Sequence, residues 1–249
     1  MTISSSPSQV CVHLLPELVD PAELAGKTAV AIDILRATTT IAHALAAGAT
    51  EVRPYVDLEA TRQAAKTLPG KVLLGGERGG VKIEGFDFGN SPAEYVAERV
   101  AAARIVFTTT NGAKAIWRCR QAARVYVAAF VNLSATVERL SQQPAVEILC
   151  AGTNGEISRE DVLMAGALAD RLETSSMTLG NDQARLARDA WRAAKAETPQ
   201  ALAETLHETQ GGRNLIALGM QADLRRAAAI DRFPQTPVWD AETGIVIGH

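Results

Sequence analysis

The sequence predicts an α/β fold: a mostly parallel or mixed sheet with helices on both faces. Short apolar runs alternate with helical patterns from about residue 28 to residue 173, which is typical of repeated βαβ units. The hydrophobic fraction of 47% and the charged fraction of 21% are those of a globular domain. Because no Gly/Ser-rich linker interrupts the chain, we expect one unit over 1–249, with a division into 10–110 and 111–249 as the alternative.

In the first half of the chain, the predicted strands end at polar or glycine-rich loops. The pattern predicts strands at 10–15, 28–32, 51–56 and 71–74 and helices at 41–47, 57–68 and 92–102. Gly48 ends the first of these helices, because glycine readily adopts the conformation that closes a helix. Ser91 as N-cap and Pro92 at the first helical position begin the last one. A long loop is expected at 75–92.

The second half continues the alternation and then becomes helical. The pattern predicts strands at 104–107, 124–129, 145–149, 236–239 and 244–247 and helices at 113–122, 134–142 and 158–172. Ser158 with Asp161 is an acidic variant of the capping pattern. The region 182–229 is almost wholly helical, with breaks at Pro199 and Gly211. We expect this helical C-terminal region either to cover the sheet or to form a homodimer.

Two parts of the chain are similar to each other. Residues 38–56 and 108–127 each contain a Thr-rich loop, an Ala-rich helix and a short strand. One explanation is a duplicated α/β unit. The other is chance, because Ala-rich helices match each other easily.

Composition excludes several classes of protein. A net charge of −3 without a block of like charges argues against a nucleic-acid surface, and no apolar run is long enough to span a membrane. The polar stretch 1–9 lacks the features of a signal peptide. The widely spaced Cys11, Cys119 and Cys150 favour reduced thiols over a disulfide framework. We therefore expect a cytoplasmic protein without a nucleic-acid or membrane partner.

Polar residues gather in the loops that follow predicted strands. Ligands of open α/β sheets bind at the carboxyl ends of the strands. The loops at such ends are 33–40, 75–92, 108–112 and 150–161. Their acidic residues are Asp33, Glu77, Asp87, Glu160 and Asp161. Carboxylates without histidine or cysteine partners suit a hard cation, and Mg²⁺ is the default.

The same loops contain groups that bind oxyanions. Arg36 and Arg78 can each bind a phosphate with two hydrogen bonds. The segment 108–112 links an apolar strand to a helical pattern, so its hydroxyls and the free N–H groups of the helix N-terminus can bind an anion. A metal and cations around an oxyanion are the usual arrangement for phosphoryl transfer.

Each of these residues also has a structural explanation. The Thr and Asn residues of 108–112 can simply cap a helix. The charged residues of 75–92 can form a solvated ion pair, and Glu160 and Asp161 can stabilise the first turn of a helix. Asp33 has the strongest functional interpretation, because an acid that ends a buried strand faces the site end of the sheet.

Known phosphatase and phosphate-binding motifs are missing. The segment 150–156 lacks the arginine of a thiolate phosphatase loop, so Cys150 is interpreted as a small buried residue. The glycine-rich segment 75–82 does not match a P-loop. Asp33 is not followed by the second aspartate of the haloacid-dehalogenase type, so an aspartyl-phosphate intermediate is not supported.

A series of motifs spans about residues 28–220. These are the segments 33–40, 76–80, 85–92, 108–112, 150–153, 160–161 and 211–215. In these segments and their order the sequence resembles the 2-phosphosulfolactate phosphatases of coenzyme M biosynthesis. The resemblance implies a Mg²⁺-dependent acid phosphatase that hydrolyses 2-phospho-3-sulfolactate to 3-sulfolactate, with an α/β fold distinct from the common phosphatase folds. A small substrate with three anionic groups matches loops that contain two arginines and several helix N-termini.

We predict Asp33 and Arg36 as catalytic residues, with direct attack by an activated water. The predicted Mg²⁺ ligands are Asp33, Glu77, Glu160 and Asp161. The predicted substrate-binding residues are Arg36, Thr38, Thr39, Arg78, Asn90, Ser91, Thr109, Thr110, Asn111, Gly112, Thr153 and Arg213. Two alternatives stay open. One is a phosphatase for a related small phosphoester, and the other is a protein that binds an anionic metabolite without hydrolysing it.

Overall fold

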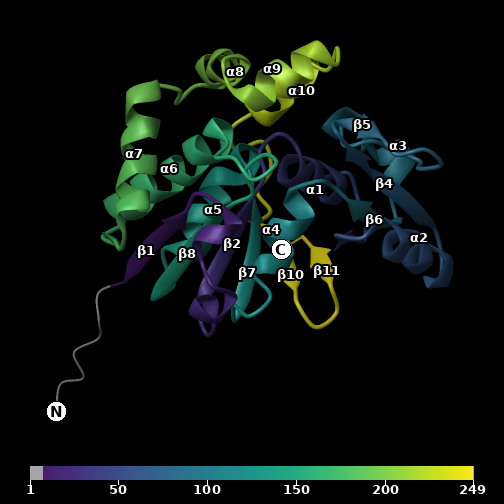
Figure 1. Cartoon of the computed structure of the whole chain (residues 1–249), viewed down its shortest axis with the longest axis horizontal. Helices are drawn as coiled ribbons and strands as arrows, with labels where there is room; N and C mark the ends of the chain where they lie inside the picture. Colours follow the sequence, from purple (N-terminus) through teal and green to yellow (C-terminus); the bar gives the residue numbers. More distant parts are fainter. Residues whose placement is uncertain (1–7, 249) are drawn as a thin grey trace.

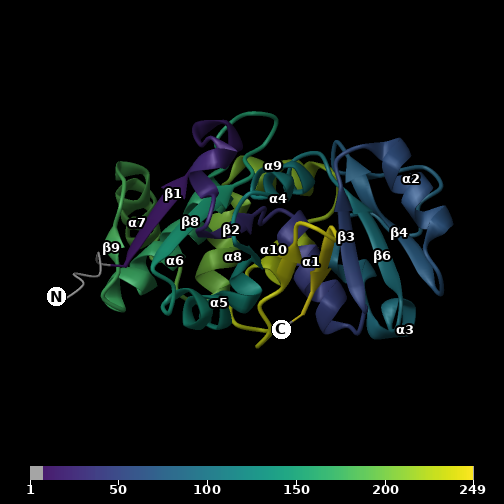
Figure 2. The same ribbon diagram turned by 90° about the horizontal axis from the view of Figure 1, so that it is seen from below.

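The computed structural model describes residues 8–248 and contains one mixed sheet of eleven strands with helices on both faces (Figures 1 and 2). The strands are β1 (Gln9–His13), β2 (Thr28–Ile32), β3 (Glu51–Tyr55), β4 (Val72–Arg78), β5 (Val81–Lys82), β6 (Arg104–Thr108), β7 (Arg124–Ala128), β8 (Ala145–Cys150), β9 (Thr178–Leu179), β10 (Val238–Asp240) and β11 (Ile245–Ile247). The predicted fold class is confirmed. We expected no signal peptide in the polar stretch 1–9. Residues 1–7 of this stretch lie outside the described residues.

The sheet contains two groups of parallel strands. Its order is β5-β4-β6-β3-β11-β10-β7-β2-β8-β1-β9. Strands β4, β6 and β3 pair in parallel on one side, and β7, β2, β8, β1 and β9 pair in parallel on the other. The antiparallel hairpin β10–β11 lies between the two groups and pairs antiparallel with β7 and β3. The last strands of the chain therefore join the two halves of the sheet.

The helices cover both faces and one end of the sheet. They are α1 (Ala37–Ala46), α2 (Leu58–Thr67), α3 (Ala97–Val100), α4 (Gly112–Arg118), α5 (Leu133–Leu140), α6 (Arg159–Thr174), α7 (Asp182–Ala194), α8 (Pro199–His207), α9 (Gln210–Ala217) and α10 (Ala222–Ala227). Figure 1 shows α8, α9 and α10 above one end of the sheet. Within the described residues, no helix is long and apolar enough to cross a membrane.

The core has two parts, one on each face of the central strands. Along β2, Val30 and Ile32 belong to one buried cluster, and Ala29 and Ala31 belong to the other. Alternate residues of a strand point to opposite faces, so both faces of β2 are buried, as parallel strands covered by helices require. Asp33 is the first polar residue after this strand, which places it at the edge of two cores.

Three local features differ from the sequence prediction. The strand predicted at 71–74 continues to Arg78 and forms a hairpin with β5. The helix predicted at 92–102 is a 3₁₀ turn at Pro92–Glu94 followed by the single turn of α3. The short strand β9 was not predicted. The first difference matters most, because it decides which side chains of β4 face the site.

The glycines of β4 explain why the strand does not end where the sequence suggested. A Cβ atom on Gly75 would lie 2.2 Å from Oη of Tyr95, and one on Gly76 would lie 2.1 Å from the carbonyl oxygen of Thr108. Glycine inside a strand often marks such a close approach of backbone or side chain. Gly75 and Gly76 therefore fit β4 between its neighbours.

Candidate active site

A pocket of about 410 Å³ opens where segments from the ends of four strands meet. Its lining consists of Asp33, Leu35, Arg36, Glu77, Gly79, Gly80, Asn90, Thr110, Asn111, Thr153, Asn154, Gly211, Asn214, Leu215, Ala217 and Leu218. Three of the segments follow the strands β2, β6 and β8, and the fourth is the end of β4. Residues 211–218 cover all four. A second cavity, of about 510 Å³ near Arg120 and Arg124, contains none of the predicted site residues.

Asp33 lies at the centre of the contacts between these segments. Its Oδ1 accepts a hydrogen bond from the N–H of Ala37, at the first turn of α1. Within residues 8–248, no protein group donates a hydrogen bond to Oδ2. A Cβ atom on Gly112 would lie 2.6 Å from this Oδ2. Gly112 therefore lets the start of α4 approach the free oxygen of Asp33.

Thr38 and Thr39 stabilise the loop that follows β2. The hydroxyl of Thr38 donates to the carbonyl of Asp33, and that of Thr39 donates to the carbonyl of Ile34. Both threonines are fully buried, and neither lines the pocket. Their side chains, which we predicted to bind substrate, are therefore occupied with shaping the loop.

Glu77 and Arg78 point in opposite directions, as successive residues of a strand do. The Glu77 carboxylate faces the pocket and accepts hydrogen bonds from the N–H groups of Thr110 (2.8 Å) and Gly80 (2.7 Å). The Arg78 guanidinium instead donates to Oγ1 of Thr108 and the carbonyl of Glu77. Arg78 does not line the pocket, although the sequence suggested it as an arginine that binds substrate.

The segment 108–112 contributes both to the start of α4 and to the pocket lining. Thr109 caps α4, because its hydroxyl accepts a hydrogen bond from the N–H of Ala113. Thr110 lines the pocket, and its buried Oγ1 has no hydrogen-bond partner within the described residues. Oδ1 of Asn111 accepts from the N–H of Asn154, which links two of the lining loops.

Asn90 and Ser91 were predicted together but have different surroundings. Asn90 is 4% exposed and lines the pocket, and its Oδ1 has no partner within the described residues. The Ser91 hydroxyl donates to Oδ1 of Asp223 at 2.7 Å and lies outside the pocket lining. Unpartnered buried polar atoms are rare, so Asn90 and Thr110 indicate that this pocket suits a polar ligand.

Asp161 and Glu160 begin α6 but differ in what their oxygens do. Both oxygens of Asp161 accept backbone N–H groups, from Ile34 (2.9 Å) and Gly152 (3.0 Å). Asp161 therefore joins two of the loops around the pocket. Glu160 is 2% exposed, and its Oε2 has no partner within the described residues. A Cβ atom on Gly211 would lie 2.0 Å from Oε1 of Glu160, so this carboxylate lies directly beneath the pocket lining.

The remaining predicted residues are Thr153 and Arg213. Thr153 lines the pocket, and its hydroxyl shares a hydrogen bond of 2.7 Å with that of Ser158. Arg213 is exposed, bonds to Gln210 and the carbonyl of Glu208, and does not line the pocket. The next residue, Asn214, lines it instead.

Arg36 is the only cationic side chain among the lining residues. Its side chain is 2% exposed and forms an ion pair of 2.9 Å with Asp223 of α10. Its other terminal nitrogen, Nη2, donates to the carbonyl of Gly80 at 2.9 Å. Asp223 was missed by the sequence analysis, because an aspartate in an Ala/Arg-rich helical pattern carries no sign of its buried partner.

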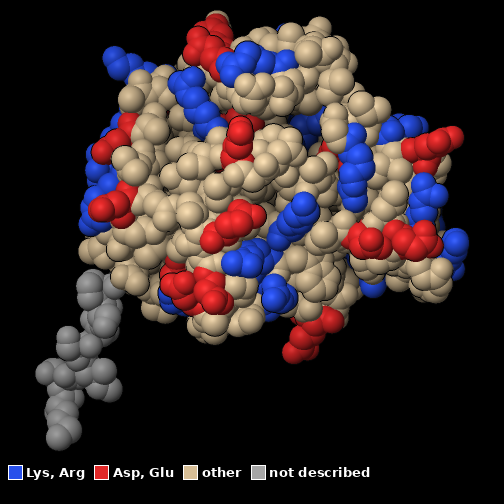
Figure 3. Space-filling model, viewed as in Figure 1, with Lys and Arg blue, Asp and Glu red and all other residues tan. Residues whose placement is uncertain are grey.

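The charges of the pocket are unbalanced. Burial raises the pKa of Asp33 to about 7, and the carboxylates of Glu77 and Glu160 also raise it, whereas Arg36 lowers it. Burial likewise raises the pKa of Glu160, and it raises the pKa of Asp161 well above its ordinary value. These acids are buried, whereas the face drawn in Figure 3 shows acidic and basic residues interspersed. The site therefore favours a proton or a cation beside its carboxylates.

The donor set suits a partly protein-bound Mg²⁺ better than a closed metal cage. Within residues 8–248, no three His, Cys, Asp or Glu side chains converge closely enough to hold a metal by themselves. The set of predicted ligands is therefore not assembled as one cluster. Oε2 of Glu160 has no hydrogen-bond partner within the described residues, and the hydrogen bond that the Asp33 carboxylate accepts from Ala37 goes to Oδ1, which leaves Oδ2 open. One or two carboxylates with water and substrate oxygens are the usual environment of Mg²⁺.

Comparisons with known proteins agree on one family. A family model described as 2-phosphosulpholactate phosphatase matches residues 13–242. A relative from Symbiobacterium thermophilum is 43% identical over 225 residues, which are 89% of this chain and 95% of the relative. A relative from Gloeobacter violaceus is 41% identical over 246 residues, 96% of this chain and 99% of the relative. Both relatives are named probable 2-phosphosulfolactate phosphatases.

Proposed function

Because this chain belongs to the 2-phosphosulfolactate phosphatase family, we propose that it hydrolyses 2-phospho-3-sulfolactate to 3-sulfolactate and phosphate. The observation that carries the proposal is the family match across residues 13–242, which includes every residue that lines the pocket. In the reaction, the oxygen of a water bonds to phosphorus and the water gives up a proton, while the ester P–O bond breaks. The departing secondary alkoxide takes a proton and leaves as the hydroxyl of sulfolactate.

The pocket offers several groups that suit a phosphate. The Arg36 guanidinium has five N–H donors, of which three are used by Asp223, Met220 and Gly80. The remaining two can bind phosphate oxygens. The free hydroxyl of Thr110 and the Nδ2 amide of Asn90 can donate neutral hydrogen bonds to phosphate oxygens. These groups orient the ester and stabilise the charge on its oxygens as the P–O bond breaks.

We further propose that the reaction requires Mg²⁺, held by Asp33 and Glu160. Phosphosulfolactate carries a phosphate, a carboxylate and a sulfonate, whereas the pocket has one arginine beside several buried acids. Without a cation, the carboxylates would repel this substrate. When bound, Mg²⁺ would neutralise phosphate charge and lower the pKa of a bound water. Glu77 and Asp161 are assigned to holding the loops, because backbone N–H groups occupy all four of their carboxylate oxygens.

Phosphate release from a panel of small phosphoesters tests the proposal. We expect the highest kcat/KM for 2-phospho-3-sulfolactate, loss of activity with EDTA, and recovery when Mg²⁺ is added. Asp33→Asn should lower kcat by at least about 100-fold with an unchanged melting temperature. Phosphate release from none of the esters, together with calorimetric binding of sulfolactate, would instead indicate a binding protein. Full activity in EDTA would refute the metal assignment alone.

A further inference from the structure

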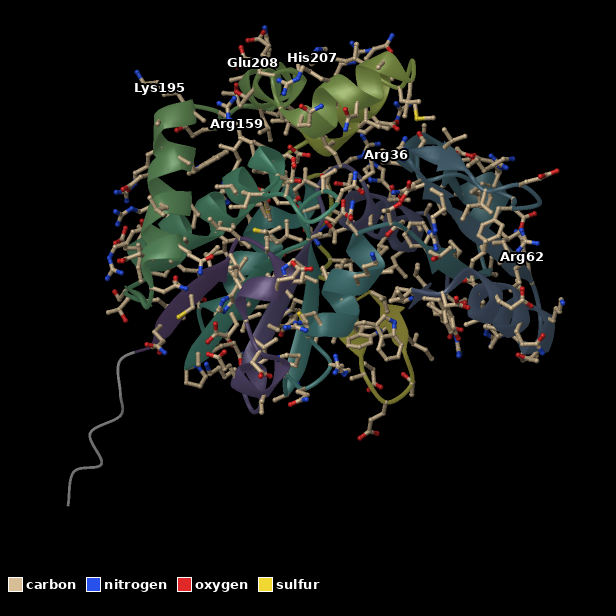
Figure 4. All side chains as sticks on the ribbon, in the orientation of Figure 1. Arg36, Arg62, Arg159, Lys195, His207 and Glu208 are labelled. Atoms are coloured by element: carbon tan, nitrogen blue, oxygen red, sulfur yellow. The ribbon has the colours of Figure 1, made fainter. Side chains whose placement is uncertain are left out.

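We propose that Asp223 is a positioning residue that orients Arg36 toward the phosphate of the substrate. The inference rests on the proposed function, in which Arg36 binds that phosphate. Asp223 lies in α10, within the helical C-terminal region, and is 3% exposed. Figure 4 shows Arg36 beneath the helices α9 and α10. The residue that holds the arginine therefore comes from about 187 positions further along the chain.

The contacts of Asp223 fix one edge of the arginine. Its Oδ2 accepts from Nη1 of Arg36 at 2.9 Å, and the same Nη1 donates to Sδ of Met220. Nη2 is held at 2.9 Å by the carbonyl of Gly80. These bonds use both N–H groups of Nη1 and one of Nη2, so Nε and one N–H of Nη2 remain. A guanidinium with one edge occupied can present the other to two oxygens of an oxyanion.

A second contact holds Asp223 itself. Its Oδ1 accepts from the Ser91 hydroxyl at 2.7 Å, so each carboxylate oxygen has a separate partner. Ser91 follows Asn90, which lines the pocket, and Arg36 follows the loop that contains Asp33. Asp223 thus ties α10 to two segments of the site. Because Arg36 and Asp223 are both buried, their pairing keeps either from being an unpaired interior charge.

Inorganic phosphate provides a test that does not depend on turnover. We expect Asp223→Asn to weaken phosphate binding, measured by calorimetry, by roughly 10-fold or more, because the guanidinium loses its orientation. Arg36→Lys should weaken it similarly, since lysine lacks the two-donor edge. The double variant should bind phosphate no more weakly than Arg36→Lys alone, because Asp223 acts only through Arg36. kcat/KM should follow the same pattern in the phosphate-release assay.

Arg226→Ala is the matched control. Arg226 lies 3.9 Å from Oδ1 of Asp223, but its side chain is 38% exposed and is not part of the pocket lining. This variant should bind phosphate within about twofold of the wild type, since the Arg226 guanidinium is more than a third exposed and its long contact with Asp223 is screened by solvent. A loss equal to that of Asp223→Asn would overturn the proposal, because any change of charge near α10 would then suffice.

The outcomes separate this inference from the proposed function. Wild-type phosphate affinity in Asp223→Asn, or losses that multiply in the double variant, would refute the positioning role. If wild-type protein binds phosphate but hydrolyses no ester, the proposed function fails and the positioning role is still tested. If Asp223→Asn shows no cooperative melting, Ser91→Ala replaces it. That variant removes the hydrogen bond from the Ser91 hydroxyl to Asp223, and an unchanged phosphate affinity would count against the inference.

Discussion

At the residue scale, the two arginines near the site have different partners, so the same substitution should affect them differently. Arg36→Lys should lower kcat/KM by about 10- to 100-fold, because lysine cannot bind two oxygens through a planar fork. Arg78→Lys should keep kcat/KM within about threefold of the wild type. Arg78 donates to the Thr108 hydroxyl and to the backbone, and it does not line the pocket. Steady-state kinetics of both variants, beside their melting temperatures, check this difference.

An equal loss of kcat/KM in the two variants would contradict the placement of Arg78. The physical reason for that placement is the length of β4. The glycines at 75 and 76 suggested a loop, and a loop would have left both Glu77 and Arg78 free to face the ligand. Since the strand continues, alternation sends Glu77 into the pocket and Arg78 away from it. The sequence shows the glycines at 75 and 76, but it does not show that Tyr95 and Thr108 pack closely against them.

At the element scale, a cluster of three titratable side chains around the buried Glu147 joins three neighbouring strands. Glu147 of β8 accepts from Lys27, just before β2, at 2.6 Å and is 2.7 Å from Nε2 of His13 in β1. Burial raises the pKa of Glu147, but the hydrogen bonds from His13 and Lys27 outweigh burial, and the net shift is downward. The cluster therefore stabilises the fold while Glu147 is ionised.

Glu147→Gln should lower the free energy of unfolding at pH 7 by about 1–3 kcal/mol, because it weakens the hydrogen bonds that the buried, charged carboxylate accepts from Lys27 and His13. A lowered pKa gives stability that is present above the unfolded-state pKa and lost as pH falls through the folded-state pKa. The difference in the free energy of unfolding between the variant and the wild type should therefore shrink below about pH 4. Urea unfolding at several values between pH 3 and pH 8 measures this difference. Glu138→Gln, at an exposed position of α5, should show no such dependence.

The elements also show where periodicity stops being informative. Most of the repeated strand and helix patterns between 28 and 173 correspond to elements, and most of these elements bury an apolar face. The segment 92–102 begins as its capping residues predicted, with the Ser91 hydroxyl accepting from the N–H of Ala93. It then turns at Tyr95, whose hydroxyl donates to the carbonyl of Gly89 and whose ring packs 4.9 Å from that of Phe88. Such tertiary contacts override a helical pattern and leave no local signal.

At the scale of the whole molecule, two connections cross the sheet in opposite directions. The unit β2–α1–β3 leads from one parallel group to the other, and the unit β6–α4–β7 leads back. The first turns of α1 and α4 meet between them, where a Cβ atom on Gly112 would lie 2.4 Å from that of Ala37. These are the two parts whose similarity the sequence showed. Both crossings therefore begin with a Thr-rich segment close to Asp33.

The position of the last two strands could not be predicted from the sequence. Periodicity identified strands near 236–239 and 244–247, but their partners β7 and β3 lie more than 100 residues earlier. Pairing at that separation depends on tertiary contacts, which a local sequence pattern does not show. For the same reason, the sequence placed Arg36 in the site but could not indicate Asp223 as its partner.

The hairpin β10–β11 should therefore be needed for stability more than for chemistry. Trp239 of β10 is 2% exposed and packs edge-to-face against Trp117 of α4, with ring centroids 5.4 Å apart. Trp239→Ala should lower the free energy of unfolding by about 3–5 kcal/mol, because a large cavity would open between the two strand groups. Ile247→Ala on β11, at a position 39% exposed, should cost less than about 1 kcal/mol.

Denaturant unfolding measures both effects, and phosphate release measured well below the melting temperature gives kcat/KM for the folded molecules. Trp239 does not line the pocket, so kcat/KM of Trp239→Ala should stay within about twofold of the wild type.

Because one sheet joins both groups of parallel strands, the loss of phosphate binding and the loss of helical structure should coincide during unfolding of the wild type. Two separate transitions would show instead that the parallel groups unfold independently and that the hairpin does not couple them.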